Sequence, residues 1–264
     1  MPEAPPIAPV TEPRGPASVI SLEGVTKRYA NGTLAVRGVD LSVARGDFVS
    51  LLGPSGCGKS TVLRMMAGLI PPSSGRVEMA GGGETGDIGF VFQEPTLMPW
   101  SSALRNVMLP LRLGGVGRQT AERRARDALA SVGLAGFEDS YPRALSGGMK
   151  MRVSIARALV TKPRLLLMDE PFAALDEITR HKLNNDLLTL WQAERFTAVF
   201  VTHSVFESVY LSRRVVVMAA RPGRVVEDLA VDAPYPRGEA FRTSADYAAH
   251  CREISSALHR AMEE

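Results

Sequence analysis

Hydrophobic residues fill consecutive positions in five short segments of the chain, and helical periodicity follows several of them. Strands that are apolar at consecutive positions are buried on both faces, as in a parallel sheet covered by helices. The pattern therefore predicts an α/β fold with a mostly parallel sheet. The predicted strands lie within FVSLLG (48–53), IGFVFQ (88–93), RLLLMDE (164–170), TAVFVTH (197–203) and RRVVVMA (213–219).

Two segments near the start of the chain have a different pattern, with β-branched residues and partial alternation of apolar and polar positions. They are VISLEGVTKRYA (19–30) and LAVRGVDLSV (34–43), and the turn residues NGT separate them. Asn-Gly between two such runs is typical of a β-hairpin. We expect an antiparallel β subdomain here.

A long stretch between the strands at 88–93 and 164–170 has no strand signal. Its segments SALRNVMLPLRL (102–113) and TAERRARDALASVGL (120–134) have helical periodicity. In the second segment one face collects Ala121, Ala125, Ala128, Leu129 and Val132. We therefore expect an inserted helical subdomain over about 95–160, within a larger domain over 18–230.

The two ends of the chain differ from the middle. Residues 1–17 are rich in proline, and this composition predicts a disordered tail. The extension 231–264 has an amphipathic helical pattern, which puts Cys251 among core residues of that helix. The predicted buried face consists of Tyr247, Cys251, Ile254, Leu258 and Met262.

Composition narrows the class of protein. The chain has 264 residues, 45% of them hydrophobic, and no apolar run long enough for a membrane span or a secretory signal. Two cysteines are too few for a disulfide framework or a zinc site, so we expect a cytoplasmic protein. The net charge of +3, without a basic run interleaved with aromatics, indicates an ordinary solvated surface and no nucleic-acid partner.

The segment GPSGCGKST (53–61) fits the P-loop pattern directly after a predicted strand and before a helix. Its glycines let backbone N–H groups surround a phosphate, Lys59 neutralises phosphate oxygens, and Ser60 offers a hydroxyl to Mg²⁺. The alternative is a glycine-rich turn with a surface lysine. The expected nucleotide contacts are Gly53, Ser55, Gly56, Cys57, Gly58, Lys59, Ser60 and Thr61.

Cys57 has a further expectation attached to it. A thiol at a helix N-terminus beside Lys59 should have a lowered pKa and raised reactivity, which bound nucleotide would suppress. The alternative is that Cys57 is simply buried.

Acidic and histidine residues follow two of the predicted strands. RLLLMDEP would deliver Asp169 and Glu170 to the carboxyl edge of the sheet, where ligands bind in such folds. Asp169 would hold Mg²⁺, and Glu170 would accept a proton from an attacking water. His203 ends the strand at 197–203, within reach of a terminal phosphate. Taken alone, an Asp-Glu pair at a helix start and a strand-end histidine are more often structural.

A second phosphate-binding pattern occurs in LSGGMKMRVSIARAL (145–159), where Ser146, Gly147 and Gly148 precede a helical run. Backbone N–H groups and the positive end of a helix would face an anion there. The sequence therefore contains two such sites.

Over residues 18 to 230 the chain resembles the ATP-binding subunit of an ABC transporter. Tyr29 matches the aromatic residue that stacks on adenine, Gln93 the Q-loop glutamine, LSGGM the ABC signature, and AALD (173–176) the D-loop. The resemblance implies a P-loop NTPase core, bound ATP and Mg²⁺, and roles for Gln93 in catalysis and metal binding. It also implies a head-to-tail homodimer in which Ser146, Gly147 and Gly148 contact the ATP of the partner subunit.

Two residues depart from the family pattern. Met149 replaces the usual glutamine of the signature, and Ser204 follows His203 where aspartate is usual. We expect Met149 to tune the signature and Ser204 to alter one local contact.

The resemblance also implies partners. Separate permease subunits would dock on the helical subdomain, with Trp100 either an anchor for them or a core residue. PTLMPW (95–100) and the C-terminal extension resemble importers of nitrate, sulfonate, taurine or related small organic molecules, which work with an extracytoplasmic binding protein. The subunit would then lie at the cytoplasmic face of the inner membrane. The alternatives are another importer class, an ABC ATPase of translation or DNA repair, and a non-catalytic binding module.

Overall fold

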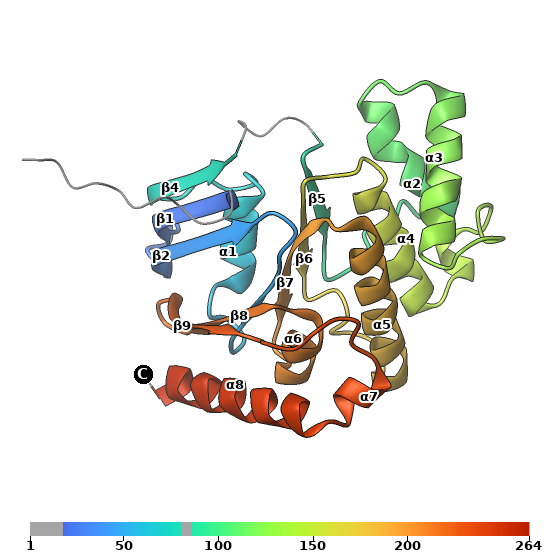
Figure 1. The fold of residues 1–264 in the computed structure, drawn as a ribbon. Coiled ribbons are helices and arrows are strands. Elements are labelled where there is room, and N and C mark those ends of the chain that lie inside the picture. The colour runs from blue at the N-terminus through green and yellow to red at the C-terminus, as the bar shows by residue number, and fades with distance from the viewer. Residues whose placement is uncertain (1–17, 81–85, 264) are drawn as a thin grey trace, which may run out of the picture.

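The computed structural model describes residues 18–80 and 86–263, so the predicted tail over 1–17 lies outside the described residues. Two sheets and the helices around them form the structure (Figure 1). The strands are β1 (Ser18–Arg28), β2 (Leu34–Ala44), β3 (Phe48–Leu52), β4 (Ser74–Met79), β5 (Ile88–Val91), β6 (Leu165–Asp169), β7 (Thr197–Thr202), β8 (Arg214–Ala219) and β9 (Arg224–Ala230). The helices are α1 (Lys59–Met66), α2 (Ala103–Leu113), α3 (Arg118–Ser131), α4 (Gly147–Leu159), α5 (Glu177–Glu194), α6 (Val205–Leu211), α7 (Glu239–Arg242) and α8 (Ala245–Glu263), with a 3-10 turn over Pro142–Ala144.

The larger sheet has six strands in the order β5-β6-β7-β3-β8-β9, and only β9 runs antiparallel to its neighbour. Every residue of β3, β6 and β7 is buried, which explains their mainly apolar sequences. The five predicted parallel strands are confirmed. The sequence pattern did not predict β9, because this edge strand is only partly buried and its sequence is mixed.

The smaller sheet is antiparallel, in the order β2-β1-β4. The predicted hairpin is confirmed as β1 and β2. Strand β4 was not predicted, because its sequence SGRVEM is polar and no residue in it is fully buried. Strand β4 forms because it pairs with β1, and its own sequence does not favour a strand.

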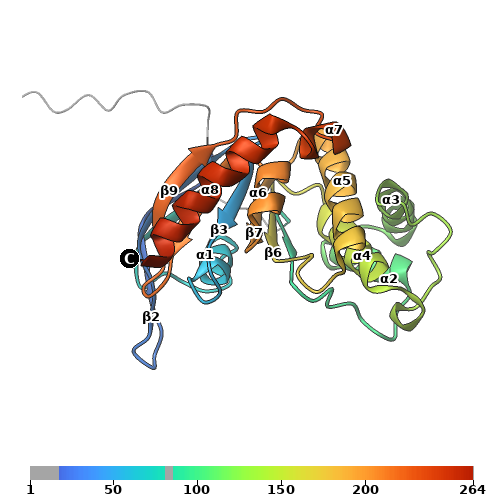
Figure 2. The same cartoon turned by 90° about the horizontal axis from the view of Figure 1, so that it is seen from below.

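Two hydrophobic clusters cover the two faces of the six-stranded sheet. In β7, Ala198 and Phe200 belong to one cluster, whereas Val199 and Val201 belong to the other. The first cluster includes α5, α6 and α8, and the second includes α1 and the antiparallel sheet. Figure 2 shows α8 and α6 lying over one face, with the helices α2, α3 and α4 set to the side.

The inserted helices α2, α3 and α4 pack against one another, and α4 contacts β5. On α3 the residues Ala121, Ala125 and Leu129 are fully buried, which confirms the face predicted from periodicity. Buried Asn106 on α2 accepts a hydrogen bond from Met98 N and donates to the carbonyls of Met98, Ser101 and Ser102. It therefore fixes the loop before α2.

The C-terminal extension forms α7 and α8, and α8 packs on α6, β8 and β9. Tyr247, Cys251 and Ile254 are buried as predicted, but Met262 is 62% exposed. The buried stripe continues through Ala257 and Ala261 instead. An α-helix has 3.6 residues per turn, so positions repeated every four residues rotate gradually away from the core. No helix in the two described ranges has the length and apolar character needed to cross a bilayer.

Candidate active site

The loop between β3 and α1 has the geometry of a phosphate cradle. Gly56 and Gly58 have φ angles of 78° and 92°, in the left-handed region that favours glycine. A Cβ on Gly58 would also lie 2.9 Å from the carbonyl oxygen of Ala35. Ser55 and Gly56 are exposed at the rim of the loop, so its backbone N–H groups can face a ligand.

The outer side of this loop is held by a turn that sequence reasoning missed. A Cβ on Gly223, between β8 and β9, would lie 2.1 Å from the carbonyl oxygen of Cys57. Gly223 N donates a hydrogen bond of 3.0 Å to the carbonyl of Ala35 at the start of β2. The Arg-Pro-Gly-Arg sequence over 221–224 was the available signal, since it marks a tight turn. Backbone from three parts of the chain therefore meets behind the P-loop.

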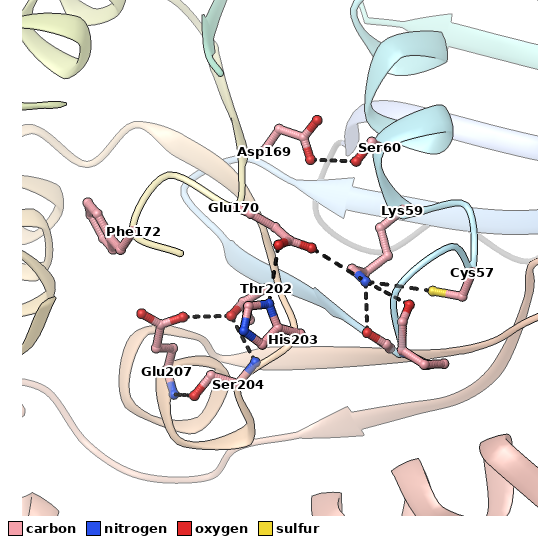
Figure 3. A network of polar contacts seen from close by, with 12 residues as sticks. Cys57, Lys59, Ser60, Asp169, Glu170, Phe172, Thr202, His203, Ser204 and Glu207 are labelled. Atoms are coloured by element: carbon pink, nitrogen blue, oxygen red, sulfur yellow. Dashed lines mark hydrogen bonds and ion pairs between the residues drawn. The ribbon is translucent and has the colours of Figure 1, made fainter. Parts of the chain in front are cut away.

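Lys59 is only 4% exposed at the start of α1. Its Nζ donates to the carbonyl oxygens of Gly53 at 2.7 Å and Pro54 at 3.1 Å, and lies 3.7 Å from Glu170 Oε1 (Figure 3). This cation is thus pointed into the loop that precedes it and toward the end of β6. The alternative of a surface lysine is wrong.

The carboxyl end of β6 carries the two predicted acidic residues. Asp169 Oδ1 accepts a hydrogen bond of 2.7 Å from Ser60 Oγ, and burial raises the pKa of Asp169 above its usual range. Glu170 follows with a φ of 45°, a conformation that costs energy for a side-chain-bearing residue and is concentrated at functional sites. These two carboxylates point toward different partners.

His203 follows β7 and turns toward Glu170. Its Nδ1 lies 3.2 Å from Glu170 Oε2, so Lys59, Glu170 and His203 converge from three neighbouring strands of the sheet (Figure 3). Ser204 begins α6, and its Oγ accepts a hydrogen bond from Glu207 N. Serine and aspartate both cap helices well, which accounts for the departure at this position.

The structure brings Tyr29 close to the P-loop helix but leaves Gln93 at the surface. Tyr29 Oη lies 3.3 Å from Thr61 Oγ1, which joins the antiparallel sheet to α1. Gln93 is exposed just beyond β5. Arg157 on α4 donates to the carbonyls of Pro95 and Thr96, so the segment after Gln93 is held by the inserted helices. Sequence reasoning missed Arg157.

The second phosphate-binding pattern begins α4. Ser146 Oγ accepts a hydrogen bond from Met149 N, and Ser146 and Gly147 are exposed. A Cβ on Gly148 would lie 2.9 Å from Cγ2 of Thr179, so this glycine allows α4 to approach α5. The helices α1 and α4 lie apart in both views (Figures 1 and 2). One molecule therefore presents two separate candidate anion-binding surfaces.

The expectation of a reactive Cys57 thiol is wrong. The side chain is fully buried, and burial raises the pKa of Cys57, an effect that outweighs the opposing one of Lys59, whose Nζ is 3.8 Å from Sγ. The helix N-terminus acts on the backbone of this residue, whereas the thiol points into the core.

Maleimide labelling of Cys57 is therefore expected to be slow with and without Mg-ATP. Cys251 is also buried, so the native chain should label at a small fraction of the rate seen in guanidinium. Mass spectrometry of the labelled peptides separates the two sites, and a Cys57→Ala variant identifies the Cys57 signal. Rapid labelling of Cys57 in the native chain would contradict its burial.

Comparisons with known proteins show which proteins this chain resembles. Residues 36–173 match the family model described as ABC transporter. A putative ATP-binding protein of Brucella abortus is 47% identical over 243 residues, which cover 91% of this chain and 93% of that protein. The aliphatic sulfonates import ATP-binding protein SsuB 1 of Mesorhizobium japonicum is 47% identical over 219 residues, 82% of this chain and 81% of that protein.

A solved structure extends the comparison to three dimensions. It is the dimeric post-hydrolysis state of an ATP-binding cassette bound to ADP and Pi, with a TM-score of 0.71 and 34% identity. The match covers 81% of this chain and 100% of that one. The predicted fold class is confirmed: a P-loop NTPase core with a mostly parallel sheet, an antiparallel β subdomain and inserted helices.

Proposed function

Because the chain belongs to the family of ABC transporter ATP-binding proteins and is an ATPase of that family, we propose that it is the ATP-hydrolysing subunit of a membrane importer. The imported solute is a sulfonate, taurine, nitrate or related small organic molecule. The name of the relative from Mesorhizobium japonicum supports the sulfonate assignment. The observation that carries the proposal is the convergence of Lys59, Glu170 and His203 beside an open P-loop.

The P-loop binds the phosphates of ATP. Backbone N–H groups of residues 55–60 surround the β-phosphate, and the Lys59 ammonium moves from the carbonyls of Gly53 and Pro54 to phosphate oxygens. Tyr29 stacks on adenine, and its position beside Thr61 supports this role.

Ser60 and Asp169 would hold Mg²⁺, with Gln93 as a further ligand. The hydroxyl and carboxylate oxygens of the first two are hard donors of the kind that Mg²⁺ prefers, and they are 2.7 Å apart. The described part of the chain has no group of three or more His, Cys, Asp or Glu side chains that could hold a metal ion. When bound, Mg²⁺ supplies positive charge at the phosphates.

Glu170 is the general base for hydrolysis. Its carboxylate accepts a proton from the attacking water as the bond between that oxygen and the γ-phosphorus forms and the bond to ADP breaks. His203, which contacts Glu170 Oε2, stays near the transferred phosphoryl group and orients the carboxylate. Lys59 stabilises charge on the phosphoryl oxygens.

The second anion-binding surface serves the partner subunit. Ser146, Gly147 and Gly148 would complete the ATP site of a second copy in a head-to-tail homodimer. The exposure of Ser146 and its separation from α1 support this arrangement. ATP then lies between the two subunits, and its γ-phosphate supplies the charge that holds them together.

Permease subunits dock beside the inserted helices. Trp100 is 74% exposed in the loop that Asn106 fixes, so the alternative of a core tryptophan is wrong and the anchor role is favoured. A cleft of about 730 Å³ opens between β5 and α2, with Phe92 and Leu113 on its rim. The exposed aromatic and the apolar cleft are each features that suit a helix from a membrane protein. The subunit would then work at the cytoplasmic face of the inner membrane with an extracytoplasmic binding protein.

The isolated chain is expected to be mostly monomeric and to hydrolyse ATP slowly. Closure of the dimer depends on phosphate charge, and a free subunit bears the whole association entropy that a permease would largely remove by tethering it. Light scattering with and without Mg-ATP measures the association. Reconstitution with the permease encoded by a neighbouring gene should raise ATPase activity and support sulfonate uptake into vesicles. A stable dimer without nucleotide, or full activity without the permease, would contradict the proposal.

A further inference from the structure

Helix α6 is short, and the C-terminal extension supplies partners for many of its carbonyl groups. The helix spans Val205–Leu211, only two turns. The last four carbonyls of any helix lack partners within it and must be satisfied from outside. Here Tyr235 and Arg237, from the segment before α7, donate to carbonyls in the last turn. Tyr247 on α8 donates to the carbonyl of Phe206 in the first turn.

Arg237 is the central donor. It is only 4% exposed, and its Nη1 lies 2.8 Å from the carbonyl oxygens of Val209 and Ser212 and 3.2 Å from that of Tyr210. The ring of Tyr235 stacks on the guanidinium, with its centroid 4.2 Å away. A positive charge at the carboxyl end of a helix is also favourable to the helix dipole. This arginine therefore binds the end of α6 tightly, with carbonyls as its hydrogen-bond acceptors.

Two tyrosine hydroxyls extend the grip along α6. Tyr235 Oη donates to the carbonyl of Leu211 at 2.8 Å, and Tyr247 Oη donates to the carbonyl of Phe206 at 3.0 Å. Phe206 lies in the first turn of the helix and Leu211 at its end. The extension thus holds both ends of α6.

His203 lies directly before Ser204, the N-cap residue of α6. Ser204 caps the helix, and its N–H donates to Thr202 Oγ1, so the backbone on both sides of His203 is fixed by contacts of α6 and β7. The His203 side chain itself is 51% exposed. About half of the ring is therefore covered, and its position relative to Glu170 depends on the backbone where β7 ends and α6 begins.

We propose that Tyr235, Arg237 and Tyr247 are positioning residues for His203. The C-terminal extension holds α6, and α6 holds the histidine at hydrogen-bond distance from Glu170. The inference rests on the proposed role of His203 in hydrolysis and assigns the extension a part in catalysis, although none of the three side chains is among the residues proposed to bind ATP.

The test is a double variant, Tyr235→Phe with Tyr247→Phe, which keeps both rings and removes only the two hydroxyls. ATP turnover of the full chain at high protein concentration is expected to fall about tenfold, because small misplacements of catalytic groups are costly. KM for ATP should change less than about twofold, since the P-loop is untouched. Arg237→Lys, which keeps the charge but loses the planar fork, should act in the same direction.

The matched control is Arg260→Ala. Arg260 on α8 binds Glu227 on β9, so this variant removes contacts between the same extension and the core without touching α6. It should retain wild-type turnover. Thermal unfolding of every variant verifies that it is folded under assay conditions. If the double variant is unfolded, the single variant Tyr247→Phe replaces it.

A double-mutant cycle with His203→Ala separates positioning from general weakening. If the extension acts through His203, the tyrosine substitutions should slow residual turnover of His203→Ala by less than twofold, because effects through one group are not additive. A tenfold loss in both backgrounds, or no loss in the wild-type background, would overturn the inference. Near-normal turnover of His203→Ala alone would instead refute the proposed catalytic role of His203, and the inference with it.

Discussion

Replacing Glu170 with glutamine is expected to abolish ATP turnover while ATP binding persists. A positioned general base contributes on the order of 10²–10⁴ in rate, and an amide cannot accept the proton. Glutamine keeps the volume of the side chain and can still hydrogen-bond to His203, which lies 3.2 Å from the carboxylate. The left-handed backbone at this position places the same demand on both residues. The ATP-bound dimer should therefore accumulate.

Phosphate release measures the loss, and equilibrium binding of a fluorescent ATP analogue measures the affinity. Glu177→Gln is the matched control. It makes the same chemical change at a nearby residue that is exposed in the first turn of α5. It should leave turnover unchanged. Near wild-type hydrolysis by Glu170→Gln would show that another group takes the proton.

Mixing two inactive versions of the chain is expected to restore nucleotide-dependent dimerisation. One version carries Lys59→Ala, which removes the phosphate-binding cation, and the other carries Ser146→Arg, which blocks the exposed start of α4. Each homodimer has two defective sites. In the heterodimer one site holds both defects, and the other joins an intact P-loop to an intact signature.

The readout is ATP capture with dimer formation, measured by light scattering for each version alone and for the mixture. Turnover is a poorer readout, because a full cycle can require two working sites. The expected result follows from signatures that act across the interface. If each signature served the nucleotide of its own subunit, both sites of the heterodimer would stay defective, and the mixture would capture no more ATP than its components.

The strands of the core could be predicted because burial on both faces gives each strand an apolar sequence of its own. FVSLL and LLLMD are apolar at nearly every position, since both faces of the sheet are covered. The P-loop could be predicted equally well, because its geometry depends on a few neighbouring glycines and one lysine. Strands β4 and β9 were not predictable in this way. They lie at sheet edges, and their order comes from pairing with β1 and β8 rather than from their own residues.

The features that sequence reasoning missed or misjudged depend on contacts between distant segments. Cys57 has a local sequence that favours a thiolate, but packing of the loop against the core buries its sulfur. Arg237 stands in a polar segment with two prolines and would pass for a surface residue. It is buried because α6 needs donors at its end. Gly223 gains its importance only from the backbone of Cys57 behind it. The roles of the site residues in chemistry remain predictions that the experiments above test.

The position of β3 in the sheet has a consequence for how the protein is made. Val49 pairs with Val199 on one side and with Arg214 on the other, so the strand that carries the P-loop lies between two strands synthesised much later. Such non-local pairing is slow, and the apolar FVSLL segment is synthesised before the strands β7 and β8 that cover its edges. ATP can stabilise a chain only once its site exists. Nucleotide is therefore expected to stabilise the chain only after β7 and β8 have been synthesised.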